Sequence, residues 1–362
     1  MKYIRILILE LLRVFFRVGV TLPRNMWYAI RTVVLPYKRI IHEGSVPLGG
    51  KICVFASYPA SGIITECLRH YIKSLHELGY AIIFVSNLPI NGESLQWLER
   101  YCSRIALREN FGRDFGAYKF AILKYEEEIR NASELLIAND SVTGPIAPLD
   151  HMFEIMTSRD VDMWGTTESY SRKMYEKYHL ASYFLVLRPT VFTSTAFWDF
   201  WHKYRLSYSR VDTIEDGEIE FTFQLINAEF KLSSYIGASE IFEFIRKDIT
   251  GSLMFLHPHL VTLALTCATN RTSLYTQLLK NLVQRFLYTD NHNVRFAKIL
   301  LMLGSPFIKR DLFSRCHYYR ADFALLLEQK VTTMSANSIL GNMRYDYKPG
   351  LISKILYAIG EK

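Results

Sequence analysis

Short apolar runs alternate with amphipathic stretches through the middle of the 362-residue chain. The runs at residues 52–56 and 81–85 predict buried strands, and the stretch between them keeps the 3.6-residue apolar period of a helix. This order predicts two parallel strands joined by a right-handed crossover. Further strands are expected at residues 105–107, 134–138, 161–165, 182–187 and 231–235, with helices between them. The pattern indicates an α/β fold.

The two ends of the chain differ from this middle part. Residues 4–20 keep their charges on one side of a helix, and the longest uncharged run before Glu10 is only four residues. Spanning a bilayer needs about 20 apolar residues. Residues 24–41 mix basic and aromatic side chains, which suits the headgroup level of a membrane. The alternative is a helical extension packed on the protein's own body.

Three regions follow from these patterns. Residues 1–45 are expected to form a basic amphipathic segment that associates with a membrane. Residues 46–250 are expected to form the α/β domain, and residues 251–362 a helical C-terminal region with amphipathic helices at 274–288 and 294–303.

The net charge of +8 is concentrated at the N-terminus. Residues 1–40 contain eight basic residues and one acidic residue, a net +7, which leaves about +1 for the other 322 residues. A nucleic-acid-binding protein would spread a basic face over its folded body. A basic, apolar leader instead indicates an anionic membrane surface as partner, and no nucleic acid is expected.

The cysteines and the missing motifs narrow the class of protein. The five cysteines are scattered without a CxxC pair, so neither a disulfide framework nor a zinc site is predicted, and a reducing cytoplasm is the expected setting. No GxGxxG follows the first strand and no GxxxxGK[ST] occurs, which argues against Rossmann dehydrogenases and P-loop enzymes. The interpretation as a nucleotidyltransferase is weakened, because no Gly-rich, Lys-bearing loop follows the first strand.

A polar turn follows the predicted strand at residues 134–138, in the order Asn139, Asp140, Ser141. The carboxyl ends of strands in an α/β sheet are where such folds bind ligands. One carboxylate with neutral oxygens beside it could hold Mg²⁺ or Mn²⁺ together with substrate phosphates. Alternatively, Asp140 only caps the turn that follows it.

Three other places carry candidate chemistry. Arg113 and Asp114 precede a helix, so an anion could bind there, or Asp114 could be the helix N-cap. His179 could be a base, a ligand or a satisfied structural residue. A carboxylate near residue 218 could deprotonate an acceptor hydroxyl, although most charge runs are solvated. The carboxylates of this acidic cluster are Glu215, Asp216, Glu218 and Glu220.

Several segments together resemble the rhamnan synthesis protein F family in order and spacing: FASYPASG, IIFVSN, ENFGRDFGAYK, LLIANDSVTGPIAPL, DMWGTTES and HLASYFLVLRP. The resemblance covers residues 51–236. Members of that family are bacterial glycosyltransferases of the GT-A type that build rhamnose-containing surface polysaccharides. The resemblance implies a GT-A-like, Rossmann-type mixed sheet flanked by helices.

The resemblance also implies an activity. The protein would transfer a sugar, L-rhamnose from dTDP-L-rhamnose, to a lipid-linked glycan acceptor in cell-surface polysaccharide or lipopolysaccharide synthesis, with inversion. It would be peripheral, at the cytoplasmic face of the inner membrane. The alternative is a catalytically inactive scaffold or sugar-nucleotide-binding protein of the same pathway.

By similarity, Asp140 is the metal-binding residue for Mg²⁺ or Mn²⁺, although the turn carries one Asp rather than Asp-x-Asp. Glu218 is the acceptor base and His179 a second catalytic residue, within the family's H-x-x-S-Y-F segment. The chain has Glu229 where the family pattern usually has Gly. The donor-binding residues implied are Ser57, Asn87, Gly112, Arg113, Asp114, Gly116, Asn139 and Ser182.

Overall fold

The computed structural model describes residues 11–12, 14–27, 40–171, 177–252, 255, 291–312, 318 and 321–343. The helix expected at residues 274–288 lies outside these residues, as do residues 1–10 of the leader.

Within the described part, nine strands form one sheet in the order β1-β4-β3-β2-β5-β9-β7-β10, with β8 paired to β7. The strands are β1 (Ile40–Glu43), β2 (Lys51–Ser57), β3 (Tyr80–Ser86), β4 (Arg104–Leu107), β5 (Glu134–Asn139), β7 (Met163–Ser171), β8 (Lys177–Leu180), β9 (Phe184–Leu187) and β10 (Leu232–Ile236). Strands β4, β3, β2 and β5 are parallel neighbours, whereas β9 is antiparallel to β5 and β7. The α/β fold with a mixed sheet is therefore confirmed.

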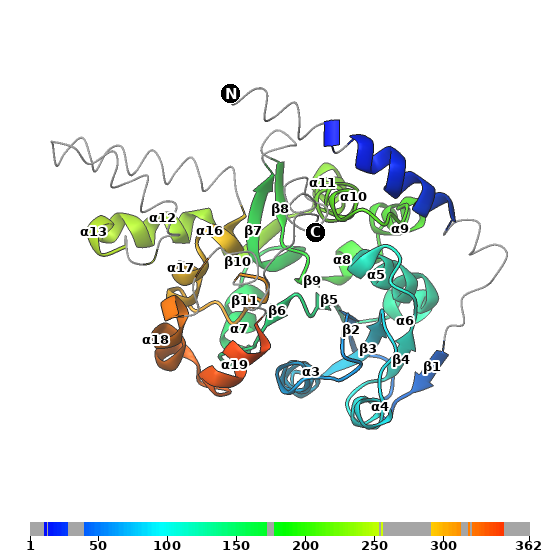
Figure 1. Cartoon of the computed structure of the whole chain (residues 1–362), viewed down its shortest axis with the longest axis horizontal. Helices are drawn as coiled ribbons and strands as arrows, with labels where there is room; N and C mark the ends of the chain where they lie inside the picture. Colours follow the sequence, from blue (N-terminus) through cyan, green and yellow to red (C-terminus); the bar gives the residue numbers. More distant parts are fainter. Residues whose placement is uncertain are drawn as a thin grey trace.

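Helices cover both faces of the sheet (Figure 1). Neighbouring strand residues point to opposite faces, so Phe55 packs in one apolar cluster with α3, α4, α7 and α12, and Val54 in another with α5, α6, α9 and α11. The helices of the body are α3 (Glu66–Glu77), α4 (Gly92–Glu99), α5 (Arg113–Lys124), α6 (Glu126–Arg130), α7 (Asp150–Ser158), α8 (Pro189–Phe192), α9 (Thr195–Lys203), α10 (Arg210–Asp212), the π-helix η2 (Thr213–Ile219), α11 (Glu220–Asn227), α12 (Ala238–Lys247) and α13 (Ile249–Ser252). The parallel βαβ unit predicted at the start is confirmed.

The structure differs from the sequence prediction at three strands. Strand β1 lies within the segment expected to associate with a membrane, yet it pairs antiparallel with β4 at the edge of the sheet. His179 does not lead into the strand that follows it, because it lies in β8, a separate strand paired antiparallel with β7. That following strand, β9, begins at Phe184 rather than at residue 182.

Glu229 has φ of +64°. This left-handed conformation favours glycine over other residues. A glycine would adopt this conformation without strain, whereas this chain has a strained glutamate just after the end of α11.

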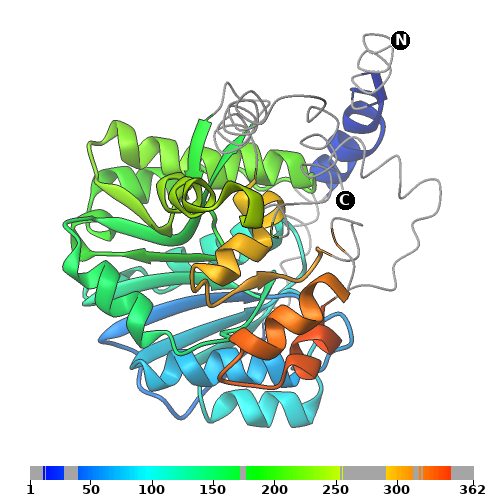
Figure 2. The same ribbon diagram turned by 90° about the vertical axis from the view of Figure 1, so that its left-hand side faces the viewer.

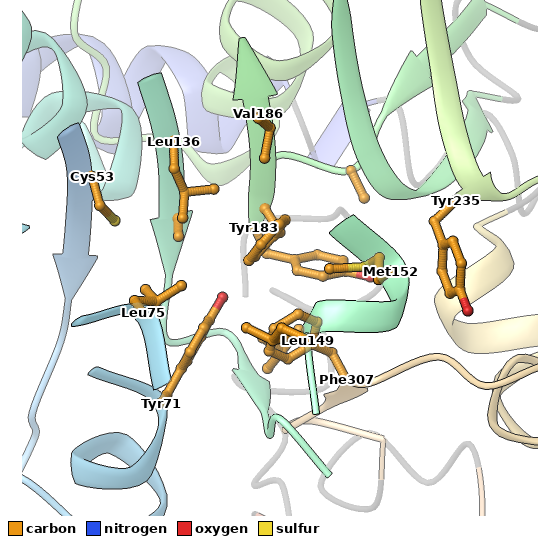
Figure 3. Close-up of a cluster of buried hydrophobic side chains, with 14 of the residues drawn as sticks. Cys53, Tyr71, Leu75, Leu136, Leu149, Met152, Tyr183, Val186, Tyr235 and Phe307 are labelled. Carbon is orange, nitrogen blue, oxygen red and sulfur yellow. The ribbon is translucent and has the colours of Figure 1, made fainter. Parts of the chain in front are cut away.

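The C-terminal part packs directly on the α/β body. Strand β11 (Ile308–Lys309) pairs antiparallel with β6 (Val142–Thr143), which follows β5. The ring centroid of Phe307 lies 4.9 Å from that of Tyr71 (Figure 3). It lies 5.3 Å from that of Phe184. Helices α16 (His292–Arg295) and α17 (Ala297–Met302) precede β11 in the chain, and α18 (Ala321–Lys330) and α19 (Ala336–Asn342) follow it. A third apolar cluster joins α17, α18 and α19. The C-terminal region thus contributes to the same body as the sheet.

Candidate functional site

The strand order reverses direction between β2 and β5. From β2 the chain builds the sheet through β3 and β4, and then returns to place β5 on the other side of β2. Such a topological switch point leaves a crevice at the carboxyl ends of the two strands, where α/β proteins bind ligands. A cavity of about 750 Å³ opens there, within the roughly 300–1,000 Å³ usual for ligand sites.

The cavity gathers most of the residues that the sequence singled out. Its wall includes Ser57, Asn87, Gly112, Arg113, Asp114, Asn139, Asp140, His179, Ser182 and Glu218. Gly116 is not on the wall. A Cβ at Gly116 would lie 2.2 Å from the backbone oxygen of Phe111, so this glycine allows the close packing of the turn beneath the cavity.

Asp140 is bonded to the end of the neighbouring strand. Its Oδ2 accepts hydrogen bonds from Ser57 Oγ at 3.0 Å and from the backbone N–H of Tyr58 at 3.1 Å. The turn after β5 is capped by Asn139 instead, whose Oδ1 accepts from the backbone N–H of Ser141 at 2.9 Å. The capping role considered for Asp140 therefore belongs to Asn139, and the Asp140 carboxylate joins β2 to β5 at the switch point.

A strained turn before α5 forms another part of the wall. Gly112 is the N-cap of α5 with φ of +78°, and Arg113 follows with φ of +53°. The side chain of Asn87 donates to the backbone oxygen of Arg113 at 3.1 Å, and Arg108 Nη1 donates to Asn87 Oδ1 at 2.7 Å. Strain of this kind persists where neighbouring contacts hold it, and it concentrates at functional sites.

Asp114 lies in the first turn of α5 and is not its N-cap. Its Oδ1 accepts from the backbone N–H of Phe115 at 3.1 Å, and its Oδ2 accepts from Asn139 Nδ2 at 3.0 Å. Burial, and then the nearby Glu218 carboxylate, raise the pKa of Asp114, while Arg113 and Lys309 oppose the rise. The turn and the end of β5 are thus tied together through a carboxyl group that resists ionisation.

Glu218 is the one residue of the acidic cluster that lines the cavity among the described residues. It lies in the π-helix η2, a form of helix frequent at functional sites. The backbone N–H of Ser182 donates to Glu218 Oε1 at 2.7 Å. His179 is 6% exposed and lies opposite Ser169 in the β7–β8 pair. The arrangement fixes one oxygen of a carboxylate at the cavity wall.

Comparison with known proteins supplies the family. The family model for rhamnan synthesis protein F matches residues 82–262. The chain belongs to the rhamnan synthesis protein F family. This confirms the resemblance stated from the sequence segments, and the family is glycosyltransferase-like.

Two other proteins are similar to this member of the rhamnan synthesis protein F family. An uncharacterized protein, y4gN, of Sinorhizobium fredii (strain NBRC 101917 / NGR234) is 28% identical over 203 residues, 56% of this chain and 52% of that protein. The chain therefore spans about half the length of this curated relative. A crystal structure of the galactosyltransferase LgtC in complex with donor and acceptor sugar analogs is 11% identical, covers 79% of this chain and 97% of that chain, and has a TM-score of 0.32.

In this family member, the residues that the C-terminal part brings to the cavity were not predicted from the sequence. Lys309, Arg310 and Asp311 line it from the end of β11, and Asn291 and Asn293 from around α16. A signal was present for the first two, because a Lys-Arg pair interrupts an apolar segment. Ser169 was also missed. Its hydroxyl is buried without a hydrogen-bond partner in the described part of the chain.

The turn after β5 does not fit the divalent-cation site expected from the sequence. Asp140 is ion-paired with Arg310, Nη1 to Oδ2 at 3.4 Å, and Ser141 Oγ accepts from Lys309 Nζ at 3.1 Å. The Asn139 oxygen is already the cap of its own turn. Among the residues described, no group of three or more His, Cys, Asp or Glu side chains could hold a metal ion. Two basic side chains therefore contact the oxygens that were expected to bind the cation.

Asp114→Asn is expected to change how stability depends on pH. A carboxyl whose pKa is raised in the folded state costs stability once the pH exceeds its unfolded pKa, and the cost is complete above the folded pKa. The variant loses one hydrogen bond with Asn139 at every pH, but it cannot ionise. The difference in Tm, variant minus wild type, should therefore rise between pH 4 and pH 7.5, as measured by thermal unfolding. A constant or falling difference would contradict the pKa direction.

Proposed function

We propose that the protein is a glycosyltransferase that moves L-rhamnose from dTDP-L-rhamnose to a lipid-linked glycan acceptor in the synthesis of cell-surface polysaccharide or lipopolysaccharide. The observation that carries the proposal is the cavity at the β2–β5 switch point of a rhamnan synthesis protein F family member. Its wall combines basic side chains, a carboxylate held by one oxygen, and amide and hydroxyl groups, which suits a ligand with both a diphosphate and a sugar.

The donor would lie along the carboxyl ends of β2, β3 and β5. Arg113 begins α5, and a helix N-terminus with free backbone N–H groups attracts phosphates. Ser57 is the last residue of β2 and Asn87 follows the end of β3, and both are suited to the nucleoside. Gly112 and Gly116 shape the turn that approaches the diphosphate, and Asp114, Asn139 and Ser182 complete the donor side, with Asp140 holding the turn after β5.

Glu218 is proposed as the catalytic base. Ser182 occupies one of its oxygens, which leaves Oε2 to take the proton of the acceptor hydroxyl. The acceptor oxygen then forms a bond to the anomeric carbon from the face opposite the diphosphate. The bond between that carbon and the phosphate oxygen breaks, the nucleoside diphosphate leaves, and the configuration is inverted. His179, on the same wall, is proposed to orient the acceptor.

The donor class is tested by a thermal-shift screen of nucleotide sugars, followed by a transfer assay on any that bind. A ligand at 100 times its Kd stabilises the folded state by about 2.7 kcal/mol, so dTDP-L-rhamnose should raise the Tm clearly, and ATP should not. If no nucleotide sugar raised the Tm, the proposal would fail. Binding of the donor without transfer to any lipid-linked acceptor would favour the inactive scaffold.

We also infer that the N-terminal helix docks on an anionic membrane, at the cytoplasmic face of the inner membrane. Residues 14–27 are helical, and the N-terminal end of this helix projects away from the body (Figure 2). Arg17 pairs with Asp212 at 3.7 Å, and Asn25 Oδ1 accepts from the backbone N–H of Tyr208 at 2.8 Å. A neighbouring side of the helix carries exposed apolar residues at helical spacing: Leu11, Val14, Phe15, Val18, Leu22 and Met26.

An exposed apolar stripe of this kind is typical of helices that lie in the membrane interface. Among the helices of the described ranges, none is long and apolar enough to cross a bilayer. The stripe and the basic leader before it would act together, since burial of apolar side chains and attraction to anionic lipid add.

Phe15→Glu with Val18→Glu is expected to weaken binding to phosphatidylglycerol vesicles at least tenfold, measured by co-sedimentation. Phe15 is 75% exposed, so the change removes two apolar anchors of roughly 1.5–3 kcal/mol each without disturbing the core. The matched control is Leu325→Glu in α18, which is 66% exposed and should bind as the wild type does. Equal binding by all three proteins would assign the stripe another role.

A further inference from the structure

Two adjacent basic residues enter the cavity from the C-terminal part of the chain. The β11–β6 pairing sets Lys309 opposite Val142, just after the turn that ends β5. Lys309 Nζ donates to Ser141 Oγ at 3.1 Å, and Arg310 Nη1 donates to the backbone oxygen of Asp140 at 2.9 Å. Their position is therefore fixed relative to the strand end where ligands of this fold bind.

The two residues before Lys309 are buried and fix the position of this basic pair. Phe307, two residues before Lys309, packs among the buried side chains beneath the sheet (Figure 3). Ile308 is buried in the cluster of the C-terminal helices. A basic pair anchored on both sides loses little freedom on binding a ligand, which favours affinity.

Part of the binding capacity of these side chains is unused within the protein. Arg310 Nε and Arg113 Nε are both buried without a hydrogen-bond partner among the residues that the structure describes. A buried donor left unsatisfied costs free energy, and both side chains line the cavity. A ligand with several acceptor oxygens would satisfy them.

Lys309 and Arg310 together can carry two positive charges, whereas Asp140, the carboxylate paired with Arg310, carries one negative charge. The one carboxylate ion-paired with Arg310 in the described part is Asp140, with the two side chains 14% and 19% exposed. Burial lowers the pKa of Lys309, while the carboxylates of Asp311 and Glu218 oppose this. An anion beside Lys309 would favour its protonated form. The site thus suits a ligand that brings its own negative charge.

We propose that Lys309 and Arg310 bind the diphosphate of the sugar nucleotide and stabilise the nucleoside diphosphate as it leaves, so that neither step requires a divalent cation. The inference rests on the proposed function. As the bond from the anomeric carbon to the phosphate oxygen breaks, its electron pair moves onto that oxygen. Donors fixed around the developing charge lower the barrier without reorganising. The ammonium and guanidinium groups keep their protons, and the acceptor proton goes to Glu218.

Isothermal titration of the full-length protein tests the inference, with inorganic pyrophosphate, dTDP and UDP as probes in buffer containing EDTA. The wild type should bind at least one of them, with a Kd that changes less than about twofold when excess Mn²⁺ replaces EDTA. Lys309→Met should weaken binding roughly tenfold to hundredfold, the range for losing a hydrogen bond to a charged group. Arg310→Met should do the same, although it also leaves Asp140 without its counter-charge.

Two further variants keep the result interpretable. Lys231→Met removes an exposed lysine next to the start of β10, where it pairs with Asp160, and should bind as the wild type does. Lys309→Arg keeps the positive charge and should retain most of the affinity. If Lys309→Met lowered the Tm as well, retained binding by Lys309→Arg would still assign the effect to charge, and loss of binding by both would overturn the inference.

The inference and the proposed function can fail separately. Wild-type binding that required Mn²⁺ or Mg²⁺, or Met variants that bound nucleotide sugars as tightly as the wild type, would overturn the inference alone. Binding of pyrophosphate that depended on Lys309, without binding of any nucleotide sugar, would overturn the function alone. If the wild type bound none of the probes and no nucleotide sugar, both would be overturned.

Discussion

Glu218→Gln is expected to lower the rate of sugar transfer by roughly 10²–10⁴-fold, the usual contribution of a positioned general base. The glutamine oxygen can still accept the 2.7 Å hydrogen bond from the Ser182 N–H, so the side chain should keep its place. Its amide cannot take the acceptor proton. The loss should therefore appear in kcat with the KM for the donor nearly unchanged, because the interaction removed is made in the transition state.

The control for this variant is Glu220→Gln. Glu220 lies two residues away at the start of α11, is exposed and does not line the cavity, so its rate should match that of the wild type. Full activity of a folded Glu218→Gln protein would refute the assignment of the base. An equal loss in donor affinity and in kcat would instead make Glu218 a donor-binding residue.

Trp201→Ala is expected to lower the free energy of unfolding by about 3–5 kcal/mol, the range for deleting a large buried aromatic side chain. Trp201 is 0% exposed. Its ring lies 5.0 Å from that of Phe200, 5.5 Å from Phe221 and 5.9 Å from Phe115. Since Phe115 follows Asp114 in the first turn of α5, the cavity that the variant leaves would also loosen the donor side of the site.

Trp201→Phe is the matched control for the aromatic cluster. Trp201 Nε1 has no hydrogen-bond partner in the ranges described, so phenylalanine removes an unsatisfied donor while keeping an aromatic ring. We expect a clearly smaller loss of stability than with alanine, measured as the free energy of unfolding in urea. Equal losses in the two variants would mean that the indole fills a space that no smaller ring can fill.

The central strands could be predicted because a strand that is buried on both faces has a continuous run of apolar residues. The runs at residues 52–56 and 81–85 correspond to β2 (Lys51–Ser57) and β3 (Tyr80–Ser86). Helix α3 was equally visible through its apolar period. That the polar residues ending β2 and β5 meet at the cavity could also be predicted, because neighbouring parallel strands end at the same edge of the sheet.

Strands β1 and β11 had no such signal. β1 is four residues long, is paired on one edge and follows a basic aromatic stretch, so its local pattern resembles the leader. β11 has two residues, and its partner β6 lies 165 positions earlier. No periodicity within a window of sequence reports a pairing across that distance, which is why Lys309 and Arg310 were not assigned to the site.

The choice of Glu218 within its acidic cluster needed more than helical periodicity. A regular 3.6-residue helix predicts which side chains share a face. Residues Thr213–Ile219 form a π-helix instead, whose wider turn shifts that phase. The family resemblance pointed to Glu218, and the structure puts it on the cavity wall while Glu215 and Glu220 are not there.

The pairing of β11 with β6 also sets the order in which the site can be assembled during synthesis. At about 5–20 residues per second, the 165 residues between Thr143 and Ile308 take roughly 10–30 s to translate. Throughout that interval the nascent chain carries Asp140 without Arg310, and Ser141 without Lys309. The proposed nucleotide pocket is therefore completed only after residue 310 has been made, so that under the proposed function an unfinished polypeptide would lack the basic pair that binds the diphosphate.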